Sequence, residues 1–278
     1  MIIGLNQNAA EEVDPAYVRA HGIRVVRRMT GGGAVYHDLG NLNYSFITDA
    51  LDTASLSMEA LTRPVCRALS ALGVAAELSG RNDICVEGRK VSGTAQRLSR
   101  GRVLHHGTLL FDTDAEALSG ALRADPEKFS SKAARSVRSR VGNIRDFLPE
   151  DMDLGEFRRV ILAELTRGGL ARESLTETEL ARVRALAAEK YESWEWNWGR
   201  APDFGFRSRR RFPGGSMEVR LDIHAGHIRD AAFAGDFMAM TGWDRAREGL
   251  PLREMFGGIT LGEILTLMFG EDAEDEGL

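Results

Sequence analysis

The sequence contains few cysteines and no long apolar segment. Cys66 and Cys85 are too few for a disulfide framework or a cysteine-rich metal site, and we expect both thiols to be reduced. No apolar run approaches the about 18 residues that span a bilayer, and residues 1–13 lack a signal-peptide pattern. These absences exclude a disulfide-stabilised scaffold, predict no membrane partner and make the cytoplasm the default location.

The overall charge is mildly acidic. A formal net charge of −5 argues against a nucleic-acid partner, although arginines are concentrated locally. At 278 residues the chain is long enough for a sizeable core and is expected to form one large domain with a smaller partner. Pro202 and Gly205 place the expected boundary at residues 201–205, between a domain of residues 1–200 and a domain of residues 206–278.

Hydrophobic periodicity predicts an α+β fold. Helical spacing is accompanied by three capping-box patterns, Thr113 with Glu116, Thr176 with Glu179 and Thr260 with Glu263. The predicted helices lie at residues 15–21, 57–72, 115–123, 154–165 and 177–190, with a last helix after Thr260. The predicted strands lie at residues 23–26, 41–48, 74–78, 84–86, 90–96, 103–111, 218–224 and 228–233. The strands between residues 74 and 111 form a meander whose turns can converge on one pocket.

The stretch of residues 27–44 reads RRMTGGGAVYHDLGNLNY and organises the rest of the sequence. Three glycines stand between two arginines and a run that alternates like a strand. Glycine leaves the backbone accessible, so Gly31, Gly32 and Gly33 could present N–H donors to a carboxylate or phosphate. An ordinary glycine-rich loop is the alternative interpretation.

Lys90 and Asp83 lie close together in the predicted meander. A lysine after a hairpin turn is commonly a solvated charge, but in a pocket with little water its ammonium could stabilise a negative charge developing in a transition state. Ser92 and Gly93 would let a ligand approach the strand. Asn82 and Asp83 are also common turn residues, yet a single carboxylate suffices to hold Mg²⁺ on a polyphosphate.

Histidines and arginines supply further candidates. Only one of His105 and His106 can face a shared pocket, because successive strand residues point to opposite faces. His37 is another candidate, and hydrogen bonding is expected because no HExxH or CxxC spacing indicates a metal site. Arg28 could pair with phosphate or carboxylate, or be solvated. Residues 129–146 have no clean period and indicate a mobile basic loop.

Cys85 and the basic residues 207–211 each have two possible interpretations. Cys85 could be a nucleophile, but it has no paired base nearby in sequence, and a small buried hydrophobic side chain is preferred. The basic residues 207–211 form either a solvated face or a docking patch for an acidic partner. The glycine loop, Lys90, the lone acid and the basic loop together fit nucleotide-dependent activation of a small acid.

Five motifs in one order resemble the lipoate-protein ligase family and span nearly the whole chain. The first, RRMTGGGAVYHDLGN at residues 27–41, is similar to the family's lipoate-binding loop. The others are GRND at 80–83 with GRKVSGTA at 88–95, HHGTLL at 105–110, SVRSRV at 136–141 and SWEWN at 193–197. The resemblance implies a mixed β-sheet catalytic domain of the biotin/lipoate ligase type flanked by helices, plus a small α/β C-terminal accessory domain.

The resemblance also implies a two-step reaction. Lipoate and ATP would give lipoyl-AMP and diphosphate, and a lysine of an acceptor would then take the lipoyl group and release AMP. The implied acceptors are lipoyl domains of 2-oxoacid dehydrogenases or the glycine cleavage H protein, with Mg²⁺ as cofactor and a monomeric enzyme. Residues 1–200 would bind lipoate and ATP.

Site residues follow from the same motifs. Lys90 would contact the lipoate carboxylate and the α-phosphate, and Asp83 would serve Mg²⁺. The remaining implied contacts to lipoate or adenylate are Arg28, Thr30, Gly31, Gly32, Gly33, Ala34, Val35, Tyr36, His37, Asn41, Asn82, Ser92, Gly93, His106 and Thr108. The residues expected to close over the adenylate are Lys132, Ser136, Val137, Arg138 and Arg140. An apolar slot for the dithiolane would use Val35, Tyr36, Leu42 and Val91.

The sequence departs from the family pattern at its start. The family normally has a helix and a strand, about fifty residues, ahead of the stretch that here begins at Met1, so a sheet edge is expected to be exposed. One alternative is an octanoyl or lipoyl transferase of the same superfamily, which uses an acyl-cysteine and no ATP; only Cys85 supports it. The other alternative is an inactive, truncated lipoyl-binding homologue.

Overall fold

The computed structural model describes residues 1–50, 57–80, 82–122, 129–131, 141–167, 169, 171–212, 215–224 and 227–235. The chain divides into two compact units. The first unit comprises Met1–Leu5, Val26–Gly120 and Arg135–Glu192. The second comprises Asn6–Val25, Ala121–Ala134 and Ser193–Leu278, so two segments from the first half of the chain group with the C-terminal part.

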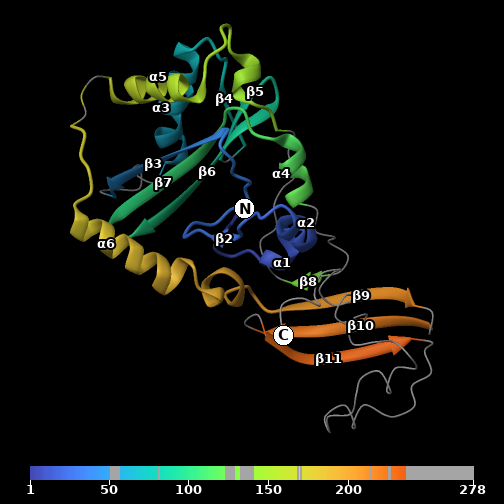
Figure 1. Ribbon diagram of the computed structural model, residues 1–278. Helices are drawn as coiled ribbons and strands as arrows, with labels where there is room; N and C mark the ends of the chain where they lie inside the picture. The colour runs from blue at the N-terminus through green and yellow to red at the C-terminus, as the bar shows by residue number, and fades with distance from the viewer. Residues whose placement is uncertain are drawn as a thin grey trace. The chain divides into compact units, whose positions relative to one another are not determined.

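A five-stranded antiparallel sheet forms the centre of the first unit (Figure 1). Its order is β3-β7-β6-β5-β4, and the meander predicted from the sequence is confirmed. Glu87 and Gly88 have φ of 50° and 71°, the pair of positive values that a tight two-residue hairpin between β5 and β6 requires. The strands are β3 (Asn41–Asp49), β4 (Glu77–Ser79), β5 (Asp83–Val86), β6 (Arg89–Ser99) and β7 (Arg102–Leu110).

Two helices cover one face of this sheet. α3 (Met58–Ala71) and α5 (Leu154–Thr166) lie side by side in Figure 1, and their apolar faces join the buried sheet residues in one core. The face beneath them is called here the covered face. Fully or almost fully buried members of its core are Val65, Leu69, Ile84, Val91, Leu109, Phe111, Phe157 and Ile161. Burial of this apolar surface makes the largest favourable contribution to the stability of the unit.

The remaining elements of the first unit are short. β1 (Ile2–Ile3) pairs in parallel with β2 (Val26–Arg27), a shorter strand than the one expected at residues 23–26. α6 (Glu177–Leu186) begins with the predicted capping box of Thr176 and Glu179 and continues as a π-helix, η4 (Ala187–Tyr191). A short 3₁₀ helix, η3 (Ile144–Phe147), follows residues 141–143.

The predicted capping box at Thr113 is wrong. α4 (Ala115–Ala121) begins one residue later than that pattern requires, and Asp114 Oδ1 accepts from the amides of Glu116 and Ala117, both at 2.9 Å. The backbone amide and carbonyl of Thr113 are instead hydrogen-bonded to the Asn143 side chain. A tertiary contact therefore occupies Thr113, and the next polar residue caps the helix.

The second unit contains a four-stranded antiparallel sheet of order β11-β10-β9-β8. β8 (Phe129–Ser131), β9 (Phe204–Phe212), β10 (Gly215–His224) and β11 (His227–Gly235) include the predicted hairpin. The basic stretch 207–211 lies within β9, where Arg207 pairs with the buried carboxylate of Glu218. The helix expected after Thr260 lies outside the described residues. This unit also contains α1 (Ala9–Glu12), α2 (Pro15–Ala20) and a π-helix, η5 (Glu195–Gly199).

The described elements bear out the α+β prediction: antiparallel sheets, one parallel strand pair and flanking helices. Among the described residues, no helix is both long and apolar enough to cross a membrane.

Candidate functional site

Strand register separates the polar residues of the central sheet into two groups. On β7, His106 and Thr108 alternate with His105, Gly107 and Leu109, and the latter three face the helices on the covered face. The opposite face is called here the site face. Its members include Asp83, Lys90, Gly93, His106 and Thr108.

Lys90 and Asp83 form an ion pair on the site face. Lys90 Nζ lies 2.8 Å from Asp83 Oδ1, and each side chain is about one quarter exposed, at 25% and 26%. Gly93 faces the pair: a Cβ added there would lie 3.2 Å from Lys90 Nζ and 3.9 Å from Asp83 Oδ1. The Gly93 amide donates to Thr108 Oγ1 at 3.4 Å. The absent side chain leaves the ammonium accessible to a ligand from this side.

A β-bulge aims Lys90 at this position. Ile84 pairs with Ser92, whereas the next residue, Cys85, pairs with Lys90, so Val91 is the extra residue. The bulge buries Val91 in the core and brings Lys90 and Gly93 to one face, although they are three positions apart. Ser92 consequently lies on the covered face with no exposed surface, away from the predicted ligand contacts. Simple alternation in the sequence contains no signal for this bulge.

Arg28 braces the glycine loop from within. Its Nη2 donates to the carbonyls of Gly31 and Gly33, both at 2.7 Å, and its Nη1 donates to the Ile2 carbonyl at 3.1 Å. Burial lowers the pKa of Arg28 to about 10, so the guanidinium remains charged at neutral pH. Gly32 has φ of 92°, a conformation that favours glycine.

The loop is attached to the site face through Thr30. Thr30 Oγ1 lies 2.6 Å from His106 Nε2 and accepts from Arg28 Nε at 3.1 Å. Burial, followed by the nearby charge of Arg28, lowers the pKa of His106 and favours the neutral imidazole. Thr30 thus joins Arg28 of the loop and His106 of β7 in one chain of hydrogen bonds. Arg97 Nη1 adds a second attachment, a hydrogen bond to the Met29 carbonyl at 2.9 Å.

Buried polar atoms without partners lie where the loop enters β3. His37 Nε2 and both polar atoms of the Asn41 amide are buried, and none has a hydrogen-bond partner in the described part of the chain. Burial is the largest cause that lowers the pKa of His37 to about 4, and the charges of the chain N-terminus and Arg28 add to it. Buried polar groups are normally paired, so these atoms are suited to bind a ligand.

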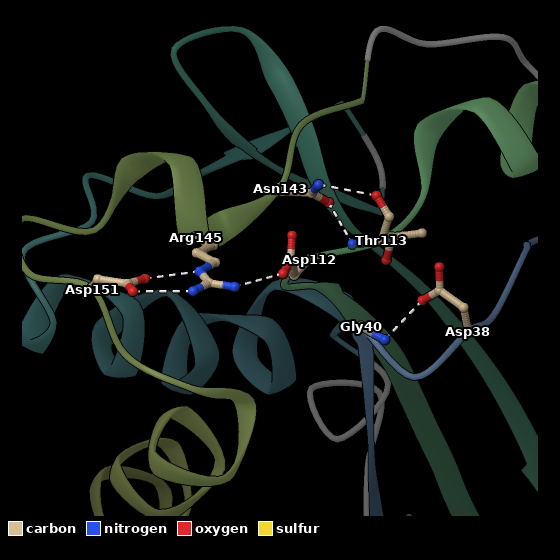
Figure 2. A network of polar contacts seen from close by, with 7 residues as sticks. All are labelled: Asp38, Gly40, Asp112, Thr113, Asn143, Arg145 and Asp151. Carbon is tan, nitrogen blue, oxygen red and sulfur yellow. Dashed lines mark hydrogen bonds and ion pairs between the residues drawn. The ribbon is translucent and has the colours of Figure 1, made fainter.

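Asp38 holds the following turn in place. Its Oδ1 accepts from the Gly40 amide at 2.9 Å, as Figure 2 shows, and its Oδ2 accepts from the Asp114 amide at 2.8 Å. The Asp38 carboxylate therefore connects the glycine loop to the segment that follows β7. Asp38 lies in the glycine-loop motif, but the motif implies no role for it.

The remaining residues predicted to contact lipoate or adenylate do not all lie on the site face. Asn82 braces the turn before β5, because its Nδ2 donates to the Thr94 carbonyl at 2.9 Å. Leu42 and Val91 pack in the core of the covered face, whereas Val35 pairs with Ile2 through backbone hydrogen bonds of 3.0 and 2.8 Å. Ala34 and Tyr36 lie on either side of Val35 in the chain. Lys132, Ser136, Val137, Arg138 and Arg140 lie outside the described residues.

Residues 141–146 make regular backbone contacts, although the sequence predicts a loop there. Residues 141–146, predicted as part of a mobile loop, include a bridge from Val141 to Lys90 and the start of η3. Asn143 and Arg145 hold this segment; the sequence interpretation includes Arg145 only as one of the arginines of the basic loop and assigns no role to Asn143. Their polar types are a weak signal, because Thr113 and Asp112, which they bind, lie 30 and 33 residues away in the chain.

No group of three or more His, Cys, Asp or Glu side chains in the described part of the chain is arranged to hold a metal ion. Cys85 pairs with Lys90 across the two strands and is buried.

Comparisons with known proteins identify the family. The family description "Lipoyl protein ligase A/B catalytic domain" matches residues 1–166, and "Bacterial lipoate protein ligase C-terminus" matches residues 201–251. The lipoate-protein ligase LplJ of Bacillus subtilis is 41% identical over 290 residues, which cover 97% of this chain and 88% of that protein.

Solved structures agree with this match. A putative lipoate protein ligase of T. acidophilum with bound lipoic acid has a TM-score of 0.61 at 32% identity, covering 71% of this chain and 81% of that chain. A study of a bipartite ligase and its E2 lipoyl domain from Thermoplasma acidophilum gives 0.61 at 33% identity, with 72% and 80% covered. A lipoate-protein ligase A bound with ATP gives 0.60 at 33% identity, with 72% and 81% covered.

These likenesses support the predicted biotin/lipoate ligase type of fold. They also favour the ligase over the two alternatives, a transferase and an inactive homologue. The matched relatives are named lipoate-protein ligases, and the match covers most of the length of each. The chain belongs to the lipoate-protein ligase family.

Proposed function

We propose that this chain activates lipoate with ATP and transfers the lipoyl group to a lysine of an acceptor lipoyl domain. In the first step a lipoate carboxylate oxygen attacks the α-phosphorus of ATP, and diphosphate leaves. In the second step the acceptor amine attacks the lipoyl carbonyl, AMP leaves, and the amine loses its proton. The relatives that match this chain are named for this ligase activity, and related structures hold lipoic acid or ATP.

The Lys90–Asp83 pair beside Gly93 is the observation that carries the assignment. A partly buried ammonium with an open side can contact the lipoate carboxylate and the α-phosphate together. Negative charge increases on these oxygens in the transition state, and a fixed cation in a site with little water stabilises it strongly. Lys90 is therefore assigned the catalytic role.

The glycine loop and its neighbours would bind the ligand. Arg28 shapes the loop through the Gly31 and Gly33 carbonyls, which supports a role in holding the ligand through the loop backbone. The unpaired polar atoms of His37 and Asn41 would supply direct hydrogen bonds. Because the pKa of His37 is lowered to about 4, this ring is neutral at physiological pH and can accept as well as donate.

Asp83 fits the kind of Mg²⁺ site that a nucleotide brings with it. Mg²⁺ is commonly bound through one or two carboxylates together with substrate phosphates, and the site face offers one carboxylate. Asp83 would hold the ion, which neutralises phosphate charge when bound. The same carboxylate pairs with Lys90 at 2.8 Å, so the proposed Mg²⁺ ligand and the proposed catalytic ammonium are neighbours.

The proposed function also includes an acceptor protein and a division of roles between the two parts of the chain. A related ligase has been studied with its E2 lipoyl domain, which supports lipoyl domains as acceptors for this chain; 2-oxoacid dehydrogenase components and the H protein are the specific candidates. We assign lipoate and ATP binding to residues 1–200 and an accessory role to residues 206–278. The proposed enzyme is a monomer in the cytoplasm.

Lipoate-dependent exchange of labelled diphosphate into ATP tests the first step, and lipoyl transfer to an apo lipoyl domain, read by mass spectrometry, tests the second. Lys90→Ala should lower the exchange rate by about 10²–10³-fold, as loss of comparable electrostatic donors does. Lys190→Ala is the matched control, because that ammonium lies over the Tyr191 ring at 5.0 Å in η4, and its activity should stay near that of the wild type.

Cys85→Ser separates the ligase from the transferase alternative. The ligase should keep near-normal activity, whereas an acyl-cysteine mechanism requires the thiol. A wild-type chain without lipoate-dependent exchange would contradict the proposed function, and full exchange in Lys90→Ala would contradict the role of that lysine.

A further inference from the structure

The backbone of Lys90 contacts a segment outside the central sheet. Val141 forms a parallel bridge with Lys90, and the Gly142 amide donates to the Lys90 carbonyl at 3.0 Å. β7 pairs with β6 only from Thr94 onward, so at Lys90 the edge of β6 that faces away from β5 is bonded by residues 141–142. The position of residues 141–142 therefore affects the backbone from which the Lys90 side chain extends.

This contact is close because residue 142 is a glycine. A Cβ at Gly142 would lie 3.1 Å from Arg89 Cβ, 3.2 Å from Arg89 Cδ and 3.3 Å from a ring carbon of Phe147. The Arg89 guanidinium in turn lies 5.0 Å from the centre of the Phe147 ring. A side chain at residue 142 would push the segment away from β6, so the hydrogen bond to Lys90 depends on its absence.

Asn143 fixes the segment at its next residue. Asn143 Nδ2 donates to the Thr113 carbonyl at 3.0 Å, and Asn143 Oδ1 accepts from the Thr113 amide at 2.9 Å (Figure 2). Asn143 is also the N-cap of η3, yet its side chain makes no capping hydrogen bond there. An asparagine at an N-cap usually bonds the first turn of its own helix. Here both polar atoms bind a backbone 30 residues away.

Arg145 adds ion pairs at the surface. Its Nη1 lies 2.7 Å from Asp112 Oδ2, and its Nε lies 2.8 Å from Asp151 Oδ1, as Figure 2 shows. The Arg145 amide also donates to the Phe111 carbonyl at 3.0 Å. Exposed ion pairs contribute little individually, so the paired amide of Asn143 is the stronger attachment of the segment to the end of β7.

We propose that Asn143 is a positioning residue for the Lys90 ammonium. It holds Gly142 against the Lys90 carbonyl and thereby fixes the bulged backbone of β6. Asn143 touches no reacting group and acts through Gly142. This inference deepens the proposed ligase function and rests on it for its kinetic consequence, whereas the structural attachment can be tested without activity.

Asn143→Ala tests the proposal in the lipoate-dependent exchange assay. Misplacing a catalytic group by about 1 Å can cost about 10²-fold in rate, so kcat should fall about 10- to 100-fold. The KM values for lipoate and ATP should change less than about twofold, because the loss falls mainly on the negative charge that increases in the transition state. Asn143→Asp retains the acceptor for the Thr113 amide and should recover part of kcat.

Asp153→Ala is the matched structural control. Asp153 Oδ1 accepts from the Glu156 amide at 2.7 Å and caps α5, so this change removes one polar attachment at the start of a helix and leaves the Asn143–Thr113 pair intact. Both variants should lower Tm, but only Asn143→Ala should lower kcat. Equal losses of kcat in the two variants, or an unchanged kcat in Asn143→Ala, would overturn the proposal.

Gly142→Ala and hydrogen exchange keep the proposal testable if Asn143→Ala does not fold. Gly142→Ala leaves the Asn143 pair intact and should lower kcat in the same way; full activity in this variant contradicts the proposal. In Asn143→Asp, the Gly142 amide should exchange faster than in Asp153→Ala, and equal protection overturns the attachment. This last measurement needs no substrate, so it stands even if wild type shows no exchange and the ligase function fails.

Discussion

The two faces of the central sheet use neighbouring residues for different purposes. His105 lies on the covered face, stacks on Phe46 at 6.1 Å between ring centres and has Nδ1 3.3 Å from Gln96 Oε1. His106, the next residue, lies on the site face and holds the glycine loop through Thr30. Strand geometry alone divides the two identical side chains between a core and a candidate active site.

The glycines of the two faces differ in the same way. Gly107 on the covered face makes room for the Tyr44 ring, a structural requirement of packing. Gly93 on the site face makes room beside the Lys90 ammonium, where a ligand can approach. The role of a glycine in a strand can therefore be assigned only when the face on which it lies is known. Three experiments test this difference between the two faces.

The largest expected effect is the pH dependence that His105 contributes to stability. Burial lowers the pKa of His105 from 6.5 to about 4, so its neutral form stabilises the fold fully above pH 6.5 and this contribution is lost as the pH falls towards 4. At about 1.4 kcal/mol per pKa unit, the change is about 3 kcal/mol over that window. His105→Phe should flatten this part of the curve, measured by urea unfolding at several pH values.

The comparison of His105→Phe with the wild type can contradict the prediction that burial keeps His105 neutral. Phenylalanine keeps an aromatic ring beside Phe46, so the variant should fold at pH 7. Other groups, including His37, titrate in both proteins and cancel in the difference between them. Identical slopes between pH 6.5 and 4 for the variant and the wild type would show that His105 is not held neutral by burial.

The second effect is a loss of stability in Gly107→Ala. The added Cβ would lie 2.5 Å from Tyr44 Oη and 2.6 Å from Cζ, and the ring is confined by Phe46 at 5.4 Å between ring centres. Overpacking of this kind costs about 1–3 kcal/mol. Denaturant unfolding should show the loss, and exchange activity of the folded protein should remain near that of the wild type.

The smallest expected effect is a loss of activity in Gly93→Ala, which makes the same glycine-to-alanine change on the site face. Here the new Cβ meets the flexible end of Lys90, 3.1 Å from Cε and 3.2 Å from Nζ, which can move aside. Stability should change by less than about 0.5 kcal/mol. Displacement of the ammonium should lower kcat/KM for lipoate about tenfold. If Gly107→Ala were the variant that lost activity and Gly93→Ala the one that lost stability, the assignment of the two faces would be reversed.

Much of the fold could be predicted from the sequence because its signals are local. Alternation identified β3 and β7 almost to the residue, and the capping box at Thr176 identified the start of α6. The cap at Thr113 failed because Asn143, far away in the chain, binds its backbone. A local pattern cannot reveal which of two adjacent polar residues is already hydrogen-bonded by a distant one.

The candidate site shows the same limit. The motifs named Lys90, Asp83 and the glycine loop, and the register places Lys90, Asp83 and Gly93 together. Ser92 was placed with them because it is close in sequence, and the bulge moved it to the covered face. Asn143 was missed because its importance depends on contacts to Thr113 and, through Gly142, to Lys90.

By itself, the sequence determined the family, the order of the elements and the residue types available for chemistry, because composition, periodicity and motif spacing are properties of the linear chain. Only the tertiary structure decided the direction of each side chain and the partner of each polar group. A single bulged residue reverses the face of every later residue in a strand, and hydrogen bonds between distant segments have no counterpart in local sequence. For this protein those two effects decide where the Lys90 ammonium lies.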